Sequence, residues 1–194
     1  MSYRLRDEFP GYHHVSTRGN NQRVTYKRDR DRLVFCSMVD RLARKFEWRI
    51  LAYALMKNHY HLLVRVGEKG LAQGMCELNT GYATWFNAEH NRINHLFGRR
   101  YWNGRSLTEA SVRERARYVV QNPRRAGGTR PLEAYKWTSY AATVGLAFPT
   151  ITLARDELLE FFGPTPERAV QAYREFCLEE PWREQSRPAA AAVT

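Results

Sequence analysis

The stretch that most constrains the fold runs over residues 56–66 and reads Met-Lys-Asn-His-Tyr-His-Leu-Leu-Val-Arg-Val. Bulky apolar residues alternate with others along it, and a Lys-Asn turn signal and Gly67 bound it, which is typical of a β-strand. Side chains on a strand alternate between its two faces. We therefore expect residues 60, 62, 64 and 66 to pack against helices, and the opposite face to carry His59, His61, Leu63 and Arg65.

His59 and His61 lie about 7 Å apart along such a strand, at a rise of about 3.3 Å per residue. Histidine is the commonest protein ligand for metal ions, so two neutral imidazoles at this spacing could bind one divalent ion. Two polar residues on a solvated sheet face would have the same spacing. The pair alone does not decide between these interpretations.

The charge of the chain favours a polyanionic partner. Its formal net charge is +11, from 31 Lys and Arg against 20 Asp and Glu, and it is spread along the sequence. Such a balance indicates nucleic acid more often than a merely basic protein, although the latter remains an alternative. Arginines alternate with aromatic residues over 99–105, and guanidinium groups bind phosphate while rings stack on unpaired bases. The expected DNA-binding residues are Arg18, Arg99, Arg100, Trp102, Arg105, Arg124 and Arg125.

Nothing in the sequence indicates a membrane or an oxidising compartment. It has no run of about 18 apolar residues, and its start lacks the hydrophobic core of a secretory signal. The cysteines, at positions 36, 76 and 177, are far apart and odd in number, so we expect buried or half-buried thiols rather than disulfides or a metal site. We expect a cytoplasmic protein that contacts no membrane and associates with the bacterial nucleoid.

Apolar spacing predicts the remaining elements. Strands are expected at residues 10–19 and 48–56, and the second should form a hairpin with the His59 strand in the middle of the sheet. Helices are expected at 31–46 and 71–90, a basic loop and strand at 91–108, and further helices at 153–162 and 166–178. We expect a catalytic domain over 1–145, a C-terminal helical extension over 146–180 and a disordered tail over 181–194.

The helix expected from residue 111 carries two polar residues off its apolar stripe. The stripe consists of Val112, Ala116, Val119 and Val120, whereas Tyr118 and Asn122 lie near one another four positions apart. Pro123 is expected to end the helix and to leave Asn122 at its frayed end. An exposed tyrosine and an asparagine that terminates a helix remain alternative interpretations.

Together these residues could perform phosphoryl transfer. A metal ion bound by His59, His61 and Asn122 would keep open positions for phosphodiester oxygens, and Mg²⁺ or Mn²⁺ suits such ligands. Tyr118 is the candidate nucleophile. A covalent phosphotyrosine preserves bond energy for rejoining, which suits DNA strand transfer better than degradation.

The sequence resembles the HUH single-tyrosine transposases, and within them the REP-associated tyrosine transposases. The resemblance rests on motifs that occur in the family's order within residues 10–145. They are His-Val-Ser-Thr-Arg-Gly-Asn at 14–20, Ala-Leu-Met-Lys-Asn-His-Tyr-His-Leu-Leu-Val at 54–64, Asn-His-Leu-Phe at 94–97, Arg-Tyr-Val-Val-Gln-Asn-Pro-Arg-Arg-Ala-Gly at 117–127 and Trp-Thr-Ser-Tyr at 137–140.

The resemblance implies an α/β (α+β) fold, a ferredoxin-like or RRM-like sandwich with a central antiparallel sheet and helices packed on it. It implies that His59 and His61 bind the metal, that Asn122 takes the third ligand position and that Tyr118 is the nucleophile. The implied substrate is single-stranded DNA beside an imperfect hairpin, and cleavage would leave a 5′-phosphotyrosine and a free 3′-OH.

Three departures from the family pattern accompany this resemblance. Lys57 stands where a proline is expected, Gly98-Arg99-Arg100 stands where relatives often have a glutamine, and Val120-Gln121 replaces the usual His-Leu. None removes a proposed ligand or the nucleophile. We expect the second and third to alter DNA contacts and site specificity.

Two alternatives share many of these residues. An RRM-like module could bind DNA or RNA hairpins without cutting them. A hydrolytic metal nuclease could use water, with Tyr118 only positioning the substrate. A monomer is favoured over a homodimer, because the C-terminal helices could cover a dimer surface.

Overall fold

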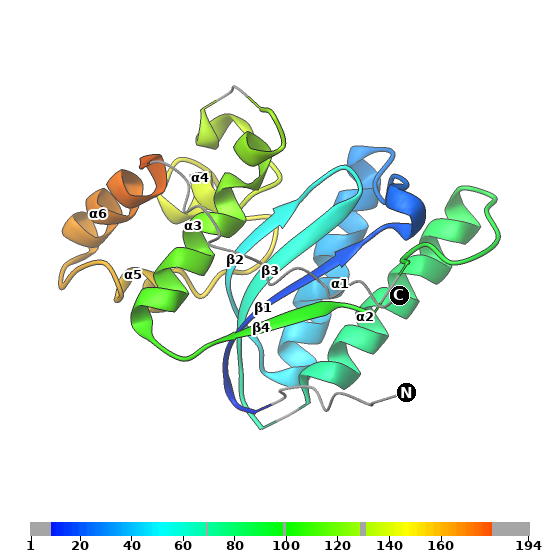
Figure 1. Cartoon of the computed structure of the whole chain (residues 1–194), viewed down its shortest axis with the longest axis horizontal. Coiled ribbons are helices and arrows are strands. Elements are labelled where there is room, and N and C mark those ends of the chain that lie inside the picture. Colours follow the sequence, from blue (N-terminus) through cyan, green and yellow to red (C-terminus); the bar gives the residue numbers. More distant parts are fainter. Residues whose placement is uncertain (1–8, 69, 99, 129–130, 180–194) are drawn as a thin grey trace, which may run out of the picture.

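The computed structural model describes residues 9–68, 70–98, 100–128 and 131–179. Its centre is a four-stranded antiparallel sheet in the order β2-β3-β1-β4 (Figure 1). The strands are β1 (Gly11–Arg18), β2 (Arg49–Leu55), β3 (His59–Val66) and β4 (Trp102–Ser106). With α1 (Asp29–Phe46) between β1 and β2, and α2 (Leu71–Glu89) between β3 and β4, the chain has the expected ferredoxin-like order of elements.

Helices α1 and α2 cover one face of the sheet, which we call the core face (Figure 1). The alternation in β3 is confirmed, because Tyr60, Leu62, Val64 and Val66 are all buried in this core. The apolar stripes of α1 and α2 face them with Phe35, Leu42, Leu78 and Tyr82 among others. Burying a side chain of this size contributes roughly 1.5–3 kcal/mol, so this face supplies much of the stability.

Helix α3 (Glu109–Arg125) crosses the other face, which we call the site face (Figure 1). The predicted stripe of Val112, Ala116, Val119 and Val120 is buried against β2 and β3 in a second apolar cluster. This cluster also contains residues of α4 (Tyr140–Thr143), α5 (Arg155–Leu159) and α6 (Pro166–Leu178). Two short 3₁₀ turns, η1 (Asn20–Gln22) and η2 (Leu132–Ala134), complete the described elements.

The expectation that β2 and β3 form a hairpin in the middle of the sheet is wrong for β2, which is an edge strand. Its buried character has another cause. Later segments cover its outer edge: Leu55 N donates to Trp137 O at 2.9 Å, Ser139 N to Tyr53 O at 3.0 Å and Ala154 N to Ile50 O at 2.8 Å. Buried edge and central strands therefore look alike in sequence.

The expectation that Pro123 ends its helix is also wrong, since α3 continues to Arg125. A proline cannot donate the backbone hydrogen bond that the carbonyl four residues earlier would accept. Here the Asn122 side chain compensates, because its Nδ2 donates to Tyr118 O at 2.9 Å and to Val119 O at 3.4 Å. Asn122 is consequently buried inside the helix and does not lie at a frayed end.

Smaller differences concern the helical boundaries and one thiol. The helix expected over 153–162 is shorter, at Arg155–Leu159, whereas the one over Pro166–Leu178 has the expected bounds. Cys36 and Cys177 are buried, but Cys76 is exposed. None of the described helices combines the length and apolar character that crossing a membrane requires. The expected tail over 181–194 and Arg99 lie outside the described residues.

Candidate active site

Part of the site face is left open beside α3 and forms a hollow of about 900 Å³. It is lined by β1, β3 and β4, by the turn after β1, by Gly98, by residues 100 and 101, and by α3. Its described lining contains no aspartate or glutamate but three arginines, at positions 18, 100 and 115. A concave surface with this charge attracts phosphate groups. The described lining residues are His14, Ser16, Thr17, Arg18, Gly19, Asn20, Asn21, Gln22, His59, His61, Gly98, Arg100, Tyr101, Trp102, Arg115, Tyr118 and Asn122.

Strand register brings the hollow's polar groups together. His61 on β3 pairs with Ser16 on β1, and Ser16 pairs with Trp102 on β4. His59 pairs with Arg18 at the end of the same ladder. Paired residues on neighbouring antiparallel strands project from the same face of a sheet. The two histidines, an arginine and a half-exposed tryptophan therefore share the floor of the hollow.

The two histidines lie side by side, with ring centroids 5.1 Å apart. Their Nδ1 atoms are both engaged: that of His59 with Asn58 Oδ1 at 2.7 Å, and that of His61 with His14 Nε2 at 2.9 Å. Since the Asn58 oxygen can only accept, His59 carries its proton on Nδ1 and has an unprotonated Nε2. This is the tautomer that a metal-binding histidine needs.

Burial keeps these imidazoles neutral at pH 7. Burial, and secondarily Arg18, lower the pKa of His59 to about 4, while a hydrogen bond that only the protonated ring can donate to the Asn122 side chain acts in the opposite direction. Burial also holds the pKa of His61 well below its usual value, with the neighbouring imidazoles and Arg18 and Arg125 acting in the same sense. Neutral imidazole is the form that binds metal ions, so protons compete little near pH 7.

The donor set fits a divalent metal ion. His59 and His61 are adjacent and neutral, and the Asn122 amide reaches the ring of His59. Because the Asn122 nitrogen is used by backbone carbonyls of α3, its oxygen is the atom that remains for a ligand. Two imidazoles and one neutral oxygen can bind an ion without cancelling its charge.

Tyr118 projects from α3 into the same hollow. Its ring centroid lies 5.7 Å from that of His61 and 5.4 Å from that of His14, both in edge-to-face arrangements. The guanidinium of Arg125 lies over the ring, 4.7 Å from its centroid. Unlike the residues of the apolar stripe, Tyr118 is only half-buried. The tyrosine, the two histidines and Asn122, although distant in the chain, thus meet in one place.

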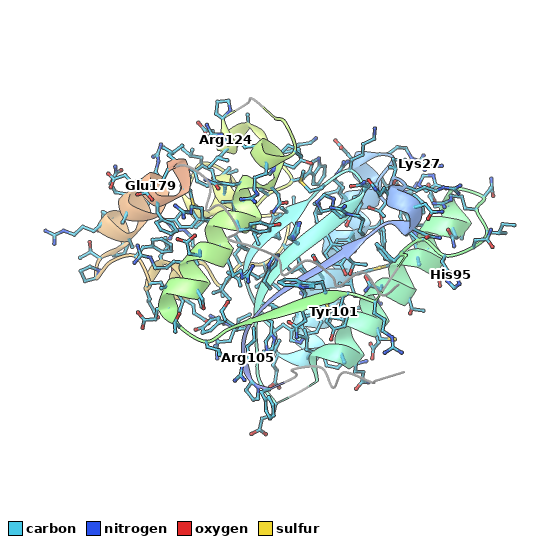
Figure 2. The ribbon with its side chains drawn as sticks, viewed as in Figure 1. Lys27, His95, Tyr101, Arg105, Arg124 and Glu179 are labelled. Atoms are coloured by element: carbon cyan, nitrogen blue, oxygen red, sulfur yellow. The ribbon has the colours of Figure 1, made fainter. Side chains whose placement is uncertain are left out.

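The residues expected to contact DNA fall into separate groups. Arg18, Arg100 and Trp102 line the hollow, and Arg125 covers Tyr118. Arg124 lines a different hollow of about 430 Å³, together with Met56, Pro131 and Tyr135. Arg105 donates to Pro10 O and lies over the ring of Phe9, away from Tyr118. Figure 2 shows Arg124 near the end of α3 and Arg105 at the far end of β4.

Sequence reasoning did not single out several residues of the hollow, and two of them contact its functional rings. His14 lies on β1 with its ring against those of His61, Tyr118 and Trp102. Arg115 lies over the Trp102 ring at 5.5 Å. Both could have been found from spacing. His14 is four residues from Arg18 on the same strand and therefore projects from the same face, and Arg115 precedes Tyr118 by three residues on a helix.

That the Val120-Gln121 departure alters DNA contacts stays a prediction, and neither side chain is among the described residues that line the hollow. Gln121 faces another part of the protein. Its side chain is buried on the far side of α3, where Nε2 donates to Cys177 O at 2.8 Å and to Glu179 O at 3.1 Å. Its neighbour Val120 belongs to the apolar cluster under α3. Val120 and Gln121 therefore serve the packing of α3 inside the protein, Gln121 through its contacts at the end of α6.

Comparison with known proteins identifies the family and shows a similar fold among solved structures. Residues 10–122 match the sequence profile of the family described as "Transposase IS200 like". The solved structure of a REP-associated tyrosine transposase bound to a REP hairpin superposes with a TM-score of 0.63 at 16% identity, and covers 79% of this chain and 92% of the other. At this identity the likeness concerns the fold.

Weaker likenesses carry no argument. A putative transposase of Deinococcus radiodurans has a TM-score of 0.41 at 13% identity, and covers 67% of this chain and 100% of the other. The tRNA(His) guanylyltransferase of Saccharomyces cerevisiae has a TM-score of 0.44 at 10% identity, and covers 90% and 82% of the two chains. No curated protein matches the sequence.

Proposed function

Because the chain belongs to the IS200-like transposase family, we propose that it is a metal-dependent endonuclease and strand transferase that acts on single-stranded DNA beside hairpins. The observation that carries the proposal is the convergence of a tyrosine from α3 with two neutral histidines from β3 in one arginine-lined hollow. A protein that only binds DNA has no need for this combination of groups.

The Tyr118 hydroxyl is the proposed nucleophile. Its oxygen attacks the scissile phosphorus, and the bond from phosphorus to the 3′ oxygen of the preceding nucleotide breaks. The phenol loses its proton, and the departing 3′ oxygen takes one up to leave as a 3′-OH. The downstream strand stays attached to the protein as a 5′-phosphotyrosine, and attack by another 3′-OH rejoins the DNA and restores the phenol.

His59, His61 and Asn122 are the residues that would hold Mg²⁺ or Mn²⁺. When bound, such an ion withdraws charge from the phosphate oxygens and orients the phosphorus for in-line attack. The protein's own contribution is to keep both imidazoles neutral and fixed. The Arg125 guanidinium over the Tyr118 ring holds the nucleophile in the hollow.

The substrate would be held by charge and by stacking. Arg18, Arg100 and Arg115 suit the phosphates of an unpaired strand, and the half-exposed ring of Trp102 offers a platform for a base. A REP hairpin is the ligand of a solved structure with a similar fold, so hairpins of that class are our proposed partners. Arg105 and Arg124 would contact DNA outside the hollow.

The domain limits and working state follow from the same proposal. Residues 1–145 would form the catalytic unit and 146–180 an extension that packs on α3, and the chain would act as a monomer. Its place of action would be the bacterial nucleoid, in the cytoplasm.

A covalent adduct tests the proposal. The protein is incubated with a pool of hairpin oligonucleotides that have randomised single-stranded flanks, in Mn²⁺ or in EDTA, and resolved on a denaturing gel. We expect a protein–DNA band that requires the metal ion and retains a label on the 3′ end, and no such band from Tyr118→Phe.

Other outcomes separate the alternatives. Cleaved DNA without an adduct would indicate a hydrolytic nuclease that uses water. Retarded but uncut DNA would indicate a binding module. An adduct that persists in Tyr118→Phe would contradict the assigned nucleophile.

A further inference from the structure

His14 contacts the rings of His61, Trp102 and Tyr118 in the hollow, and it is neither a proposed ligand nor the proposed nucleophile. It projects from β1 on the same face as Ser16, and its pair with Leu63 lies two residue pairs from the Ser16–His61 pair. Its ring centroid lies 5.1 Å from that of His61, 5.1 Å from that of Trp102 and 5.4 Å from that of Tyr118. It is buried, with 2% of its surface exposed, and it lines the hollow.

Gly104 makes room for the ring of Trp102 beside His14. Gly104 on β4 pairs with His14. A Cβ at Gly104 would come within 2.3 Å of the Trp102 ring, so glycine lets that ring lie back over β4. Trp102 can therefore pack edge-to-face on His14, which fixes the imidazole from the side opposite to His61.

The hydrogen bond between the two imidazoles decides which nitrogen of His61 can bind a ligand. His14 Nε2 lies 2.9 Å from His61 Nδ1, and both atoms are buried. Two imidazole nitrogens form a hydrogen bond only when one carries the proton and the other does not. If His61 is the donor, its Nε2 has a free lone pair, but if His14 is the donor, that Nε2 carries a proton.

We propose that His14 is a positioning residue, which accepts the Nδ1 proton of His61 and thereby presents His61 Nε2 to the metal ion. This inference rests on the proposed function. Metal-bound histidines commonly donate their second nitrogen to an oxygen, and here a neutral imidazole takes that role. Among the described groups His14 Nδ1 has no hydrogen-bond partner, so metal binding and the tautomer of His14 are coupled.

The residue pair His13 and His14 supplies a matched control. His13 is equally buried on the same strand but projects from the core face, where its nitrogens contact Asn103 Oδ1 at 3.0 Å and Phe9 O at 2.9 Å. Replacing either by phenylalanine removes an imidazole from β1, but only His14→Phe removes the acceptor for His61. His14→Gln retains an acceptor oxygen.

The first experiment titrates each full-length protein with Mn²⁺ alone, followed by calorimetry. We expect His14→Phe to bind about tenfold more weakly than wild type, because loss of such a supporting hydrogen bond costs about 10–100-fold in metal affinity. We expect His14→Gln to recover most of the loss and His13→Phe to match wild type. Wild-type affinity in His14→Phe, or an equal loss in His14→Gln, overturns the inference.

The second experiment needs no variant and so does not depend on folding of His14→Phe. Two-bond ¹H–¹⁵N spectra of the wild-type protein saturated with Mg²⁺ should show His61 protonated on Nδ1 and His14 protonated on Nδ1. A proton on Nε2 of either ring overturns the inference. If wild type binds Mn²⁺ and forms the DNA adduct while these signs are absent, only the role of His14 fails; if it binds no Mn²⁺, the proposed metal site fails with it.

Discussion

The two faces of the sheet are built from the same strands, but one is packed into the core and the other is partly open and polar. On the core face, α1 and α2 bury an apolar surface, and the Tyr60 hydroxyl there has partners inside the protein: it accepts from Thr17 at 2.9 Å and donates to Asn79 at 2.6 Å. On the site face, α3 covers β2 and part of β3 and leaves the rest to the hollow. The core face stabilises the fold, and the site face leaves polar groups exposed in the hollow, where a ligand could bind.

Tyrosine shows the difference most clearly. Tyr60 lies between His59 and His61 in sequence, yet strand alternation turns it to the core face, where burial raises its pKa far above the usual value. Tyr118 comes from a distant helix and lies beside the same histidines. Proximity in sequence therefore says little about which phenol can act, whereas the face from which it projects decides it.

The largest predicted effect separates these two tyrosines. Tyr118→Phe should lower the rate of adduct formation by on the order of 10³-fold or more, because this variant lacks the proposed attacking oxygen, and should leave the fold intact. Tyr60→Phe should keep the rate but lower the free energy of unfolding by about 1–2 kcal/mol, since Thr17 and Asn79 lose a buried partner. Gel-resolved adduct kinetics and urea unfolding measure the two.

The opposite result for Tyr60→Phe would contradict the division of the sheet into a core face and a site face. Strong loss of activity in Tyr60→Phe without loss of stability would mean that the core face takes part in the reaction.

Local patterns sufficed for much of the fold. The two faces of β3, the stripe of α3 and the aromatic core of α2 were predictable, because period-2 and period-3.6 burial are properties of neighbouring residues. The edge position of β2 was not, since residues 137–154 that cover it come much later in the chain. The passage of α3 through Pro123 depends on a side-chain hydrogen bond that no propensity encodes.

The site was predictable to a similar extent. His59 and His61 share a strand, and Tyr118 and Asn122 share a helix, so each pair could be found from spacing. That the two pairs meet depends on how α3 crosses the sheet, for which only the family resemblance gave an expectation. The role of His14 needs the register of β1 against β3, which sequence spacing within one strand cannot give.

Acid should lower the free energy of unfolding through the buried histidines of the site face. Burial, and secondarily Arg115, lower the pKa of His14 to about 3, and that of His59 is lowered to about 4. An unfolded histidine has a pKa of about 6.5, so below this pH the unfolded chain binds protons that the folded protein excludes. The free energy of unfolding should therefore fall as pH decreases from about 6.5, by about 1.4 kcal/mol per pH unit for each such histidine.

Urea unfolding between about pH 6.5 and 5 measures this slope while carboxylates remain ionised. His14→Phe lacks one of the excluded protons, so its slope should be smaller than that of wild type by about 1.4 kcal/mol per pH unit. An unchanged slope would mean that the His14 ring is already positively charged in the folded protein at these pH values.

The smallest predicted effect applies the same contrast to the two sides of α3. Asn122 and Gln121 are adjacent, both buried and both amides, but Asn122 lines the hollow while Gln121 donates to Cys177 O and Glu179 O beside α6. Arg117 acts on the Gln121 side too, donating to Glu179 at 3.1 Å and lying 4.2 Å over the ring of Phe176.

Asn122→Ala should therefore weaken Mn²⁺ binding by about tenfold, or about 1.4 kcal/mol, because the ion loses a neutral oxygen. Gln121→Ala should leave Mn²⁺ affinity unchanged and speed amide hydrogen exchange in α6 by a similar factor, since α6 loses two hydrogen bonds to α3. Calorimetry and exchange measured on both variants test the two sides together. If Gln121→Ala impaired metal binding as much as Asn122→Ala did, α6 would have to support the ligands through α3, and the division of this helix into a binding side and a structural side would fail.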